Sequence, residues 1–293
     1  MKTNEQKVLL AVLAHPDDET FGMGGSLAYY ASIGVKVYLV CATRGEAGDV
    51  PPELMHGYGS VAELREQELC CAAKHLGLSG VFFLGFRDSG MTGSPDNHHP
   101  NALAATSMET VALEIIRYIR LLKSQVIITF DPIGGYMHPD HIAVHRATEK
   151  AFHLAADPTI DFPDLPPFRP QKLYYHTFPR GFLRLVVWMM RLTGKDPHKF
   201  GRNGDIDLVP VAEARFPVNA RVDYRLVLEK KDNATECHAS QGGSRITTGV
   251  IGLFRKLFGI SDQYMRAYPP PERRSERDLF EGVLIEETTT PAT

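Results

Sequence analysis

Two short clusters of histidine and aspartate carry most of the chemistry in this sequence. The first, residues 15–19, reads His-Pro-Asp-Asp-Glu, and the second, residues 138–141, reads His-Pro-Asp-His. Two neutral imidazoles and one carboxylate, with water in the remaining positions, form an open catalytic zinc site. We therefore predict that His15, Asp18 and His141 bind one divalent metal. The same ligand types suit Fe²⁺, Mn²⁺ and Co²⁺, so the presence of a metal is better defined than its identity.

The other members of the clusters are candidates for proton transfer. Asp17 is adjacent to Asp18, and neighbouring side chains diverge, so we expect Asp17 outside the ligand set as the general base for metal-activated water. A helix N-cap is the alternative for Asp17. His138 is expected to be an imidazolium that stabilises the oxyanion or the leaving amine, with Asp140 fixing its tautomer. The alternative for Asp140 is an ordinary acid in the first turn of a helix.

Alternating apolar patterns predict the elements that position these clusters. Continuous apolar runs predict buried strands over four segments: 7–14, 35–43, 81–84 and 126–130. Helical periodicity separates them over four further segments: 24–33, 61–76, 108–123 and 139–155. This alternation predicts an α/β fold with a doubly wound, mainly parallel sheet. Polar residues follow every strand, and the carboxyl ends of strands are where such sheets bind ligands.

The pattern is weaker after residue 156. We expect strands at 172–176 and 213–219 and a helix at 222–240. We predict one domain over residues 1–287, with 180–204 and 243–286 as lid or oligomer-contact insertions, and a disordered tail at 288–293. The apolar, Arg- and Lys-containing segments 182–192 and 250–260 fit a packed helix, a lid or an oligomer contact; the alternative is an amphipathic segment on a membrane surface.

Composition excludes several classes of protein. The 293 residues contain 32 Lys and Arg against 35 Asp and Glu, a net charge of −3, which argues against a nucleic-acid binder. No apolar run reaches the length of a membrane span, and no targeting segment is recognisable. The four scattered cysteines predict a reducing, cytoplasmic environment without a disulfide framework. The glycines at 22, 24 and 25 do not form the dinucleotide-binding GxGxxG pattern.

Residues 14–19 together with 138–141 resemble the zinc-dependent N-deacetylases of the LmbE/PIG-L family. The similarity extends to Glu46, Arg65 and residues 238–241, and it covers most of 5–156 and, more loosely, 205–242. The resemblance implies a Rossmann-like fold and hydrolysis of an N-acyl group, usually acetyl, from a glucosamine-type sugar.

The resemblance also implies roles for individual residues. His15, Asp18 and His141 match the zinc ligands, Asp17 the general base, and His138 with Asp140 the group that stabilises the intermediate or acts as acid. Tyr136 would polarise the carbonyl. Three residues match positions that contact substrate: Glu46, Arg65 and Asp88.

The segments 45–50 and 87–91 are most similar to the mycothiol branch of the family, which contains a deacetylase of an N-acetylglucosaminyl-inositol and an amidase of thiol conjugates. We therefore expect a zinc-dependent N-deacetylase of a small amino-sugar molecule. We also expect the chain to form a homo-oligomer. An amidase for a bulkier acyl group is the nearest alternative. A non-catalytic carbohydrate- or metal-binding protein is the alternative from another class.

Overall fold

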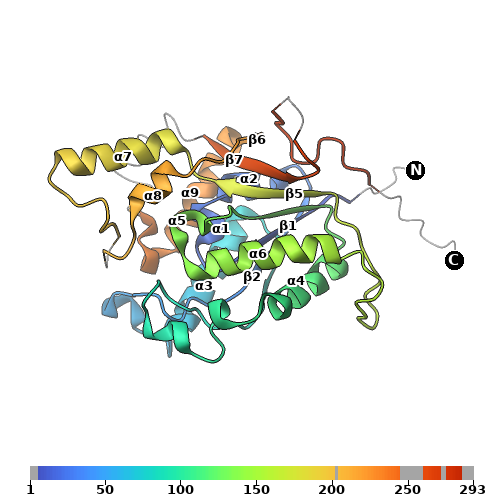
Figure 1. Cartoon of the computed structure of the whole chain (residues 1–293), viewed down its shortest axis with the longest axis horizontal. Coiled ribbons are helices and arrows are strands. Elements are labelled where there is room, and N and C mark those ends of the chain that lie inside the picture. The colour runs from blue at the N-terminus through green and yellow to red at the C-terminus, as the bar shows by residue number, and fades with distance from the viewer. Residues whose placement is uncertain (1–5, 202–203, 245–259, 272–274, 286–293) are drawn as a thin grey trace.

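The computed structural model describes residues 6–201, 204–244, 260–271 and 275–285. A seven-stranded sheet with the order β3-β2-β1-β4-β5-β7-β6 runs through the molecule (Figure 1). The strands are β1 (Val8–Leu13), β2 (Lys36–Cys41), β3 (Gly80–Phe83), β4 (Val126–Phe130), β5 (Lys172–Thr177), β6 (Ala220–Asp223) and β7 (Ser261–Tyr268). The first five pair in parallel, whereas β7 is antiparallel to both of its neighbours. The predicted α/β fold is confirmed.

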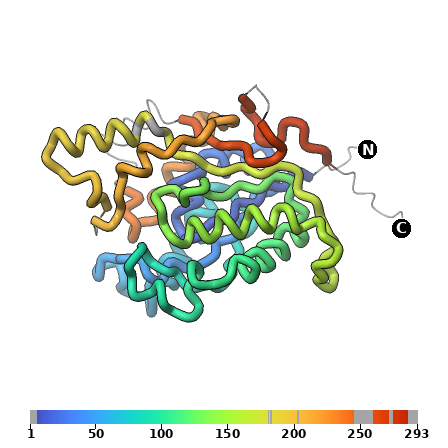
Figure 2. The backbone as a smooth tube through the Cα atoms, viewed as in Figure 1, coloured from blue at the N-terminus to red at the C-terminus, as the bar shows by residue number. Residues whose placement is uncertain are grey.

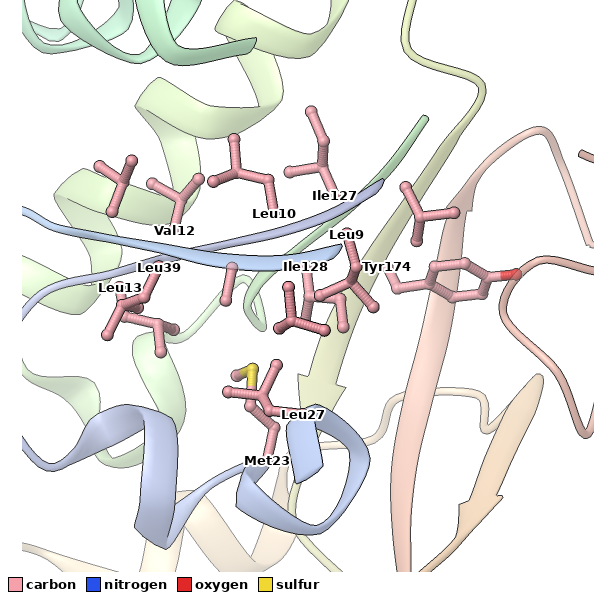
Figure 3. Close-up of a cluster of buried hydrophobic side chains, with 14 of the residues drawn as sticks. Leu9, Leu10, Val12, Leu13, Met23, Leu27, Leu39, Ile127, Ile128 and Tyr174 are labelled. Atoms are coloured by element: carbon pink, nitrogen blue, oxygen red, sulfur yellow. The ribbon is translucent and has the colours of Figure 1, made fainter. Parts of the chain in front are cut away.

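Helices cover both faces of the sheet. They are α1 (Asp18–Phe21), α2 (Gly24–Ser32), α3 (Val61–Leu76), α4 (Met108–Leu122), α5 (Gly134–Met137), α6 (Pro139–Leu154), α7 (Arg180–Leu192), α8 (Leu208–Glu213) and α9 (Leu228–Cys237). Helices α4 and α6 pack together against β1 and β4, and α2 packs on the other face with α3 and α9 behind it. Strand β1 is therefore buried along its whole length, which explains its uninterrupted apolar sequence. Figure 3 shows this core, with Leu10 and Ile127 on one side of the strands and Met23 and Leu27 on the other.

Local signals in the sequence explain where the main helices begin and end. The Ser60 side chain accepts a hydrogen bond from the Glu63 N–H at the start of α3, and Gly77 ends that helix in the left-handed conformation. Ser107 caps α4 in the same way, through the Thr110 N–H. These bounds agree with the sequence expectation because capping and apolar periodicity act over a few residues.

The sequence expectation was wrong in the last third of the chain. Residues 214–219 are irregular rather than a strand, and strand β6 follows at 220–223. The expected helix at 222–240 is shorter, since only 228–237 is α-helical. Strand β7 was not predicted, and it pairs with both β5 and β6. Much of segment 250–260, and the tail at 288–293, lie outside the described residues.

Helices α7 and α8 form an arm at one end of the molecule. The arm extends past the carboxyl end of β5 (Figure 1), and in the tube view its loop turns back toward the body (Figure 2). The arm has its own small apolar cluster, in which Val187 packs with Leu208 and Ala212. Within the described residues, no helix is long and apolar enough to span a lipid bilayer.

The scattered cysteines predicted no disulfide framework, but the structure contains one disulfide. Cys71 on α3 and Cys237 at the end of α9 form a disulfide, although 166 positions separate them in the sequence. They meet because α3 packs along α9. Cys41 and Cys70 are free.

The sheet order places the two histidine clusters together. The connections run outward in opposite directions from β1 and β4, which are neighbours, so the sheet has its topological switch point between them. The first cluster follows β1, and the second lies beyond β4 at the start of α6. A crevice at such a point is the usual ligand site of an open α/β sheet.

Candidate active site

The three predicted metal ligands converge. The Nδ1 atom of His15 lies 3.2 Å from Nε2 of His141 and 3.6 Å from Oδ2 of Asp18, and His141 Nε2 lies 3.3 Å from Asp18 Oδ1. Ligand atoms about 2.0–2.1 Å from a tetrahedral metal lie about 3.3–3.4 Å from one another. All three side chains are almost completely buried. This donor set therefore fits a divalent cation in both chemistry and spacing.

Proximity alone admits other ligand sets. The ligand atoms of His15, His138 and His141 lie within 4.8 Å of one another, and so do those of His15, Asp88 and Asp140. The two ring nitrogens of His15 point to different groups. Its Nδ1 atom lies beside His141, and its Nε2 atom lies beside Asp88 and Asp140. The mixed histidine and aspartate set on the Nδ1 side has ligand-atom distances of 3.2 to 3.6 Å, which are compatible with a single ion.

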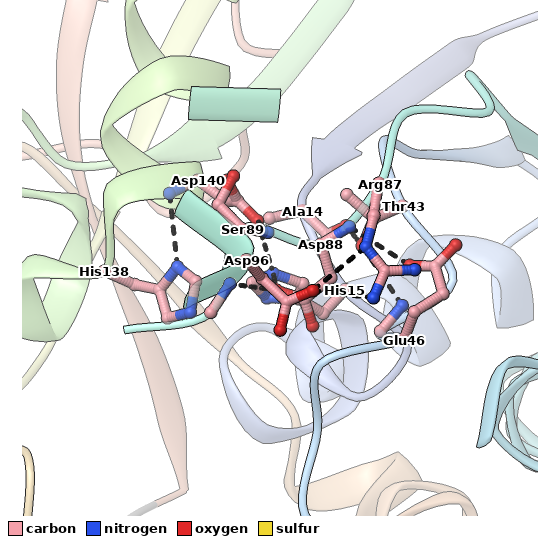
Figure 4. Close-up of polar contacts among 12 residues, drawn as sticks. Ala14, His15, Thr43, Glu46, Arg87, Asp88, Ser89, Asp96, His138 and Asp140 are labelled. Atoms are coloured by element: carbon pink, nitrogen blue, oxygen red, sulfur yellow. Dashed lines mark hydrogen bonds and ion pairs between the residues drawn. The ribbon is translucent and has the colours of Figure 1, made fainter. Parts of the chain in front are cut away.

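Two carboxylates orient the His15 ring from its far side. Its Nε2 atom lies 3.1 Å from Asp140 Oδ2 and 3.4 Å from Asp88 Oδ1 (Figure 4). Burial lowers the pKa of His15, but the negative charges of Asp88, Asp140 and Asp18 outweigh it and raise the pKa well above its ordinary value. A proton on Nε2 leaves the Nδ1 lone pair free, which is the arrangement that orients histidine ligands of metals. The Asp140 carboxylate therefore supports His15, whereas we expected it to support His138.

His138 interacts with Asp140 through the backbone. Its Nδ1 atom accepts a hydrogen bond of 3.2 Å from the Asp140 N–H and so caps α6. Burial, together with the positive charge of His15, lowers the pKa of His138 to about 3. The expected imidazolium is therefore disfavoured in this structure. Because Nδ1 accepts, a neutral His138 carries its proton on Nε2, where it can donate to a negatively charged oxygen.

Asp17 has a strained backbone. Its φ of 132° lies in a region that residues other than glycine rarely adopt. The Glu19 carboxylate accepts the Asp17 N–H at 3.0 Å, and Arg65 donates to Asp17 Oδ2 at 3.1 Å. Asp17 occupies the N-cap position of α1, but its side chain makes no capping hydrogen bond. Such strain is typical of functional positions, where surrounding contacts hold the residue in place.

Opposing influences act on the acidity of Asp17 and Asp18. Burial raises the pKa of Asp17, and the nearby Arg65 guanidinium opposes this shift. Burial also raises the pKa of Asp18, to about 7, against the opposing charge of His15. Two adjacent carboxyl groups with raised proton affinity lie beside a histidine pair, which is a favourable environment for both cation binding and proton transfer.

Arg65 is buried and holds the loop around Asp17. One of its terminal nitrogens donates to the Pro16 carbonyl at 2.7 Å as well as to Asp17, and the other donates to the Gly45 carbonyl at 3.1 Å. A Cβ atom at Gly45 would lie only 2.2 Å from the guanidinium, so this position requires glycine. The guanidinium lines the pocket, but the hydrogen bonds to Pro16, Asp17 and Gly45 join it to protein groups.

A buried ion pair behind Asp17 was not predicted. His238 Nε2 lies 2.7 Å from Glu19 Oε1, and both side chains are fully buried. The attraction between the charges raises the pKa of His238 and lowers that of Glu19, in each case against the effect of burial. Glu19 was part of the first histidine cluster and residues 238–241 were part of the family similarity, so the signals were present. Their contact, across 219 positions, was not visible in the sequence.

Residues expected to contact substrate differ in their surroundings. Asp88 lines the pocket, and its carboxylate accepts the Gly90 N–H as well as facing His15. Glu46 accepts the Asp88 N–H at 3.1 Å and so shapes the loop after β3, but it does not line the pocket.

Tyr136 lies on an irregular turn before α6. Asp131 at the end of β4 accepts the N–H groups of Ile133 and Gly135, which holds this turn. The Tyr136 ring lies edge-on to His141, with 4.9 Å between centroids. Burial and the nearby aspartates raise the pKa of Tyr136 well above its ordinary value, so the phenol keeps its proton and remains a hydrogen-bond donor.

A pocket of about 340 Å³ opens over these groups. Its lining includes His15, Asp17, Arg65, Asp88, Tyr136, His138, Asp205, Ile206 and Gln241. Asp205 and Ile206 come from the loop of the α7–α8 arm, and neither was predicted as a site residue. A second cavity, of about 110 Å³, lies on the other side of Asp17 and Asp18 and is walled by Phe21, Met23, Phe130 and Phe178. Polar groups thus face one cavity, and mainly apolar groups face the other.

Comparison with known proteins places this site in a family. The family described as GlcNAc-PI de-N-acetylase, PIG-L, matches residues 10–152. A 1D-myo-inositol 2-acetamido-2-deoxy-α-D-glucopyranoside deacetylase of Thermobifida fusca is 37% identical over 96% of this chain and 99% of its own length. The enzyme of the same name from Thermobispora bispora is 39% identical over 94% of this chain and 93% of its own.

Solved structures share the fold at lower identity. The N,N'-diacetylchitobiose deacetylase of Pyrococcus horikoshii superimposes with a TM-score of 0.61 at 20% identity, covering 89% of this chain and 84% of that one. GalB, a 4-carboxy-2-hydroxymuconate hydratase of Pseudomonas putida, gives a TM-score of 0.59 at 18% identity, covering 92% and 99%. The fold thus supports more than one reaction. On the strength of its full-length relatives, this chain belongs to the PIG-L (LmbE) family.

Proposed function

We propose that this chain is a zinc-dependent N-deacetylase that removes the acetyl group from an N-acetylglucosamine unit of a small molecule. The observation that carries the proposal is the convergence of His15, Asp18 and His141 beside the strained Asp17. The full-length relatives named as deacetylases of an N-acetylglucosaminyl-inositol support this substrate class.

The three converging residues would hold the cation. A divalent metal bound there supplies Lewis acidity, which lowers the pKa of water and polarises a carbonyl. His15 is oriented for this role by the carboxylates at its Nε2 atom, and Asp18 is oriented by accepting the His15 N–H at 2.8 Å. Iron, manganese and cobalt suit the same donors as zinc.

The surrounding residues would move protons and stabilise charge. Asp17 accepts a proton from the attacking water, and the adjacent Arg65 guanidinium opposes the rise in the Asp17 pKa that burial causes. The water oxygen bonds to the acyl carbon, the C–N bond breaks, and protonated Asp17 returns the proton to the leaving nitrogen. The Nε2–H of His138 and the phenol of Tyr136 donate hydrogen bonds to the acyl oxygen as it becomes negative.

The larger pocket would bind the sugar. Arg65, Asp88, Asp205 and Gln241 supply charged and amide groups there, and several spaced hydrogen-bonding groups are what a hydroxyl-rich ligand requires. The smaller, mainly apolar cavity would then receive the acyl group. Its volume of about 110 Å³ exceeds the space of one water molecule several-fold, which favours tolerance of acyl chains longer than acetyl. An amidase acting on a bulkier acyl group is therefore the second candidate.

Acetate release from defined substrates tests the proposal. The metal-loaded protein should hydrolyse 1D-myo-inositol 2-acetamido-2-deoxy-α-D-glucopyranoside faster than free N-acetylglucosamine or diacetylchitobiose. Chelation should abolish the activity, and added Zn²⁺ should restore it. The matched N-propionyl and N-butyryl compounds distinguish the two candidates, because an amidase would prefer the longer chains. Absence of hydrolysis with every compound in the metal-loaded protein would overturn both.

A further inference from the structure

Helix α7 carries two apolar stripes, and among the described residues only one of them packs against a neighbouring element. Leu183, Val187 and Met190 face α8 and pack in the small cluster of the arm. The other stripe consists of Leu185, Trp188, Met189 and Leu192, which follow the i, i+3, i+4, i+7 spacing of one helix face. These four side chains are 37% to 66% exposed. Contiguous exposed apolar side chains of this size mark an interaction surface.

Basic side chains adjoin the exposed stripe. Residues 180–195 contain three arginines and one lysine and no acidic residue. Over residues 180–215 there are seven Lys and Arg against four Asp and Glu, whereas the whole chain is acidic by three charges. The arm is therefore a basic region on an acidic protein, so its field favours a partner of negative charge.

A groove between α7 and α8 brings the two features together. It has a volume of about 550 Å³ and is lined by Arg184, Arg191, Arg215 and Trp188, with Glu213 as its single acid. Arg184 and Arg191 are exposed. A tryptophan beside several arginines, on a helix with exposed apolar side chains, matches the composition of helices that lie in the interface of a bilayer.

We propose that the exposed face of α7 docks on an anionic lipid surface. Leu185, Trp188, Met189 and Leu192 enter the boundary between headgroups and acyl chains, and Arg184 and Arg191 contact the phosphates. The arm extends past the carboxyl end of β5, so the helix can lie on a surface without displacing the core (Figure 1). Its loop reaches the site through Asp205 and Ile206, so a docked protein would have a bilayer near its pocket.

The sole tryptophan of the chain makes this proposal directly measurable. Trp188 is the only tryptophan among the 293 residues, so intrinsic tryptophan emission reports on this helix alone. With vesicles of phosphatidylcholine and phosphatidylglycerol, we expect a blue shift of the emission and co-sedimentation of the protein. Vesicles of phosphatidylcholine alone should produce neither effect at the same lipid concentration. Raising the salt concentration should weaken the binding by screening the arginines.

Paired variants separate the two contributions. Arg184→Gln with Arg191→Gln should weaken partitioning by about 30-fold, since each basic residue near an anionic surface contributes about fivefold. Leu185→Ser with Leu192→Ser should weaken it at least about tenfold through lost apolar burial. Leu121→Ser is the matched control, because Leu121 is a similarly exposed leucine on α4, away from the arm. All of these variants should keep the hydrolytic activity of the parent on a dissolved substrate.

Three results would overturn the proposal. The first is unchanged emission and no co-sedimentation with anionic vesicles. The second is equal binding to neutral and anionic vesicles, or a loss of vesicle binding in Leu121→Ser as large as in the α7 variants. In either case the arm would have no specific role in binding. The third is Trp188 emission that is already blue-shifted without lipid. A shift that fades on dilution would then identify a second copy of the chain as the occupant, and one that persists would identify another segment of the same chain.

Discussion

The Nδ1 atom of His15 lies 3.2 Å from the Nε2 atom of His141, which is 126 residues further along the chain. His15 follows β1 and His141 lies in the first turn of α6, and the parallel pairing of β1 with β4 brings these segments together. The contact joins the two histidine clusters into one site. Asp18, within 3.6 Å of both rings, completes a donor set that neither cluster forms alone.

Removal of one ligand should release the metal. His141→Ala should lower metal content to a small fraction of one ion per chain, because the remaining two groups cannot hold a cation tightly. His153→Ala is the matched control, since His153 lies on the same helix and is exposed. Metal analysis of the two purified variants by plasma mass spectrometry is the measurement. Full metal retention in His141→Ala would mean that another set, such as His15 with Asp88 and Asp140, binds the ion.

Substitutions of Asp17 and Asp18 should differ in their effects on metal content and turnover. Asp17→Asn should keep the metal and lose turnover by about 10²- to 10⁴-fold, the usual contribution of a general base. Asp18→Asn should lose metal and activity together. Metal content and kcat are measured on the same preparations. If Asp17→Asn with full metal content turns over within about threefold of the parent, Asp17 is not the base.

The contact between Gly45 and Arg65 should be essential for activity. Gly45→Ala would place a Cβ atom 2.2 Å from the guanidinium and displace it from Asp17. Lost hydrogen bonds to a charged group are worth about 1.5–3 kcal/mol, so kcat/KM should fall about tenfold or more. Gly34→Ala controls for backbone strain, because Gly34 also has a positive φ but has no neighbour within 4 Å of the added atom. Equal losses of kcat/KM in the two variants would contradict the prediction.

Asp131 should make stability depend on pH. Burial raises its pKa to about 6 although three backbone groups stabilise the charge, so the folded state binds this proton more tightly than the unfolded state. The stabilisation is complete below the ordinary pKa of 3.8 and is lost as the pH rises through about 6. Asp131→Asn keeps an acceptor oxygen without the charge. Metal-free Asp131→Asn should therefore match the parent near pH 4 and exceed its stability above pH 6, by up to about 3 kcal/mol.

Denaturant unfolding between pH 4 and pH 8 measures this difference. If the difference in free energy of unfolding between Asp131→Asn and the parent stays constant across this pH range, the charge of Asp131 is not the cause of that difference.

The disulfide between Cys71 and Cys237 should stabilise the protein under oxidising conditions. It closes a loop of 166 positions, for which chain entropy gives at most about 5 kcal/mol. Cys71→Ser should melt at lower temperature than the parent without reductant, and the difference should shrink with reductant. Cys70→Ser, which changes the exposed free neighbour, should melt like the parent in both conditions. Identical melting of Cys71→Ser and the parent without reductant would show that the bond does not form.

The sequence by itself determined the elements of the first half and the two clusters that follow its strands. Buried strands, amphipathic helices and serine caps leave signals within a few residues, so α3 and β4 have the predicted bounds. The sequence also indicated that His15, Asp18 and His141 would meet, because strands of a parallel sheet end at the same edge.

Only the tertiary structure decided the contacts between distant segments. It turned the Asp140 carboxylate toward His15, placed Arg65 on Asp17 and paired Glu19 with His238. It also joined Cys71 to Cys237 and added β7 to the sheet. Each of these contacts depends on how two segments pack across the chain, and apolar periodicity records which face of a segment is buried but not which partner covers it.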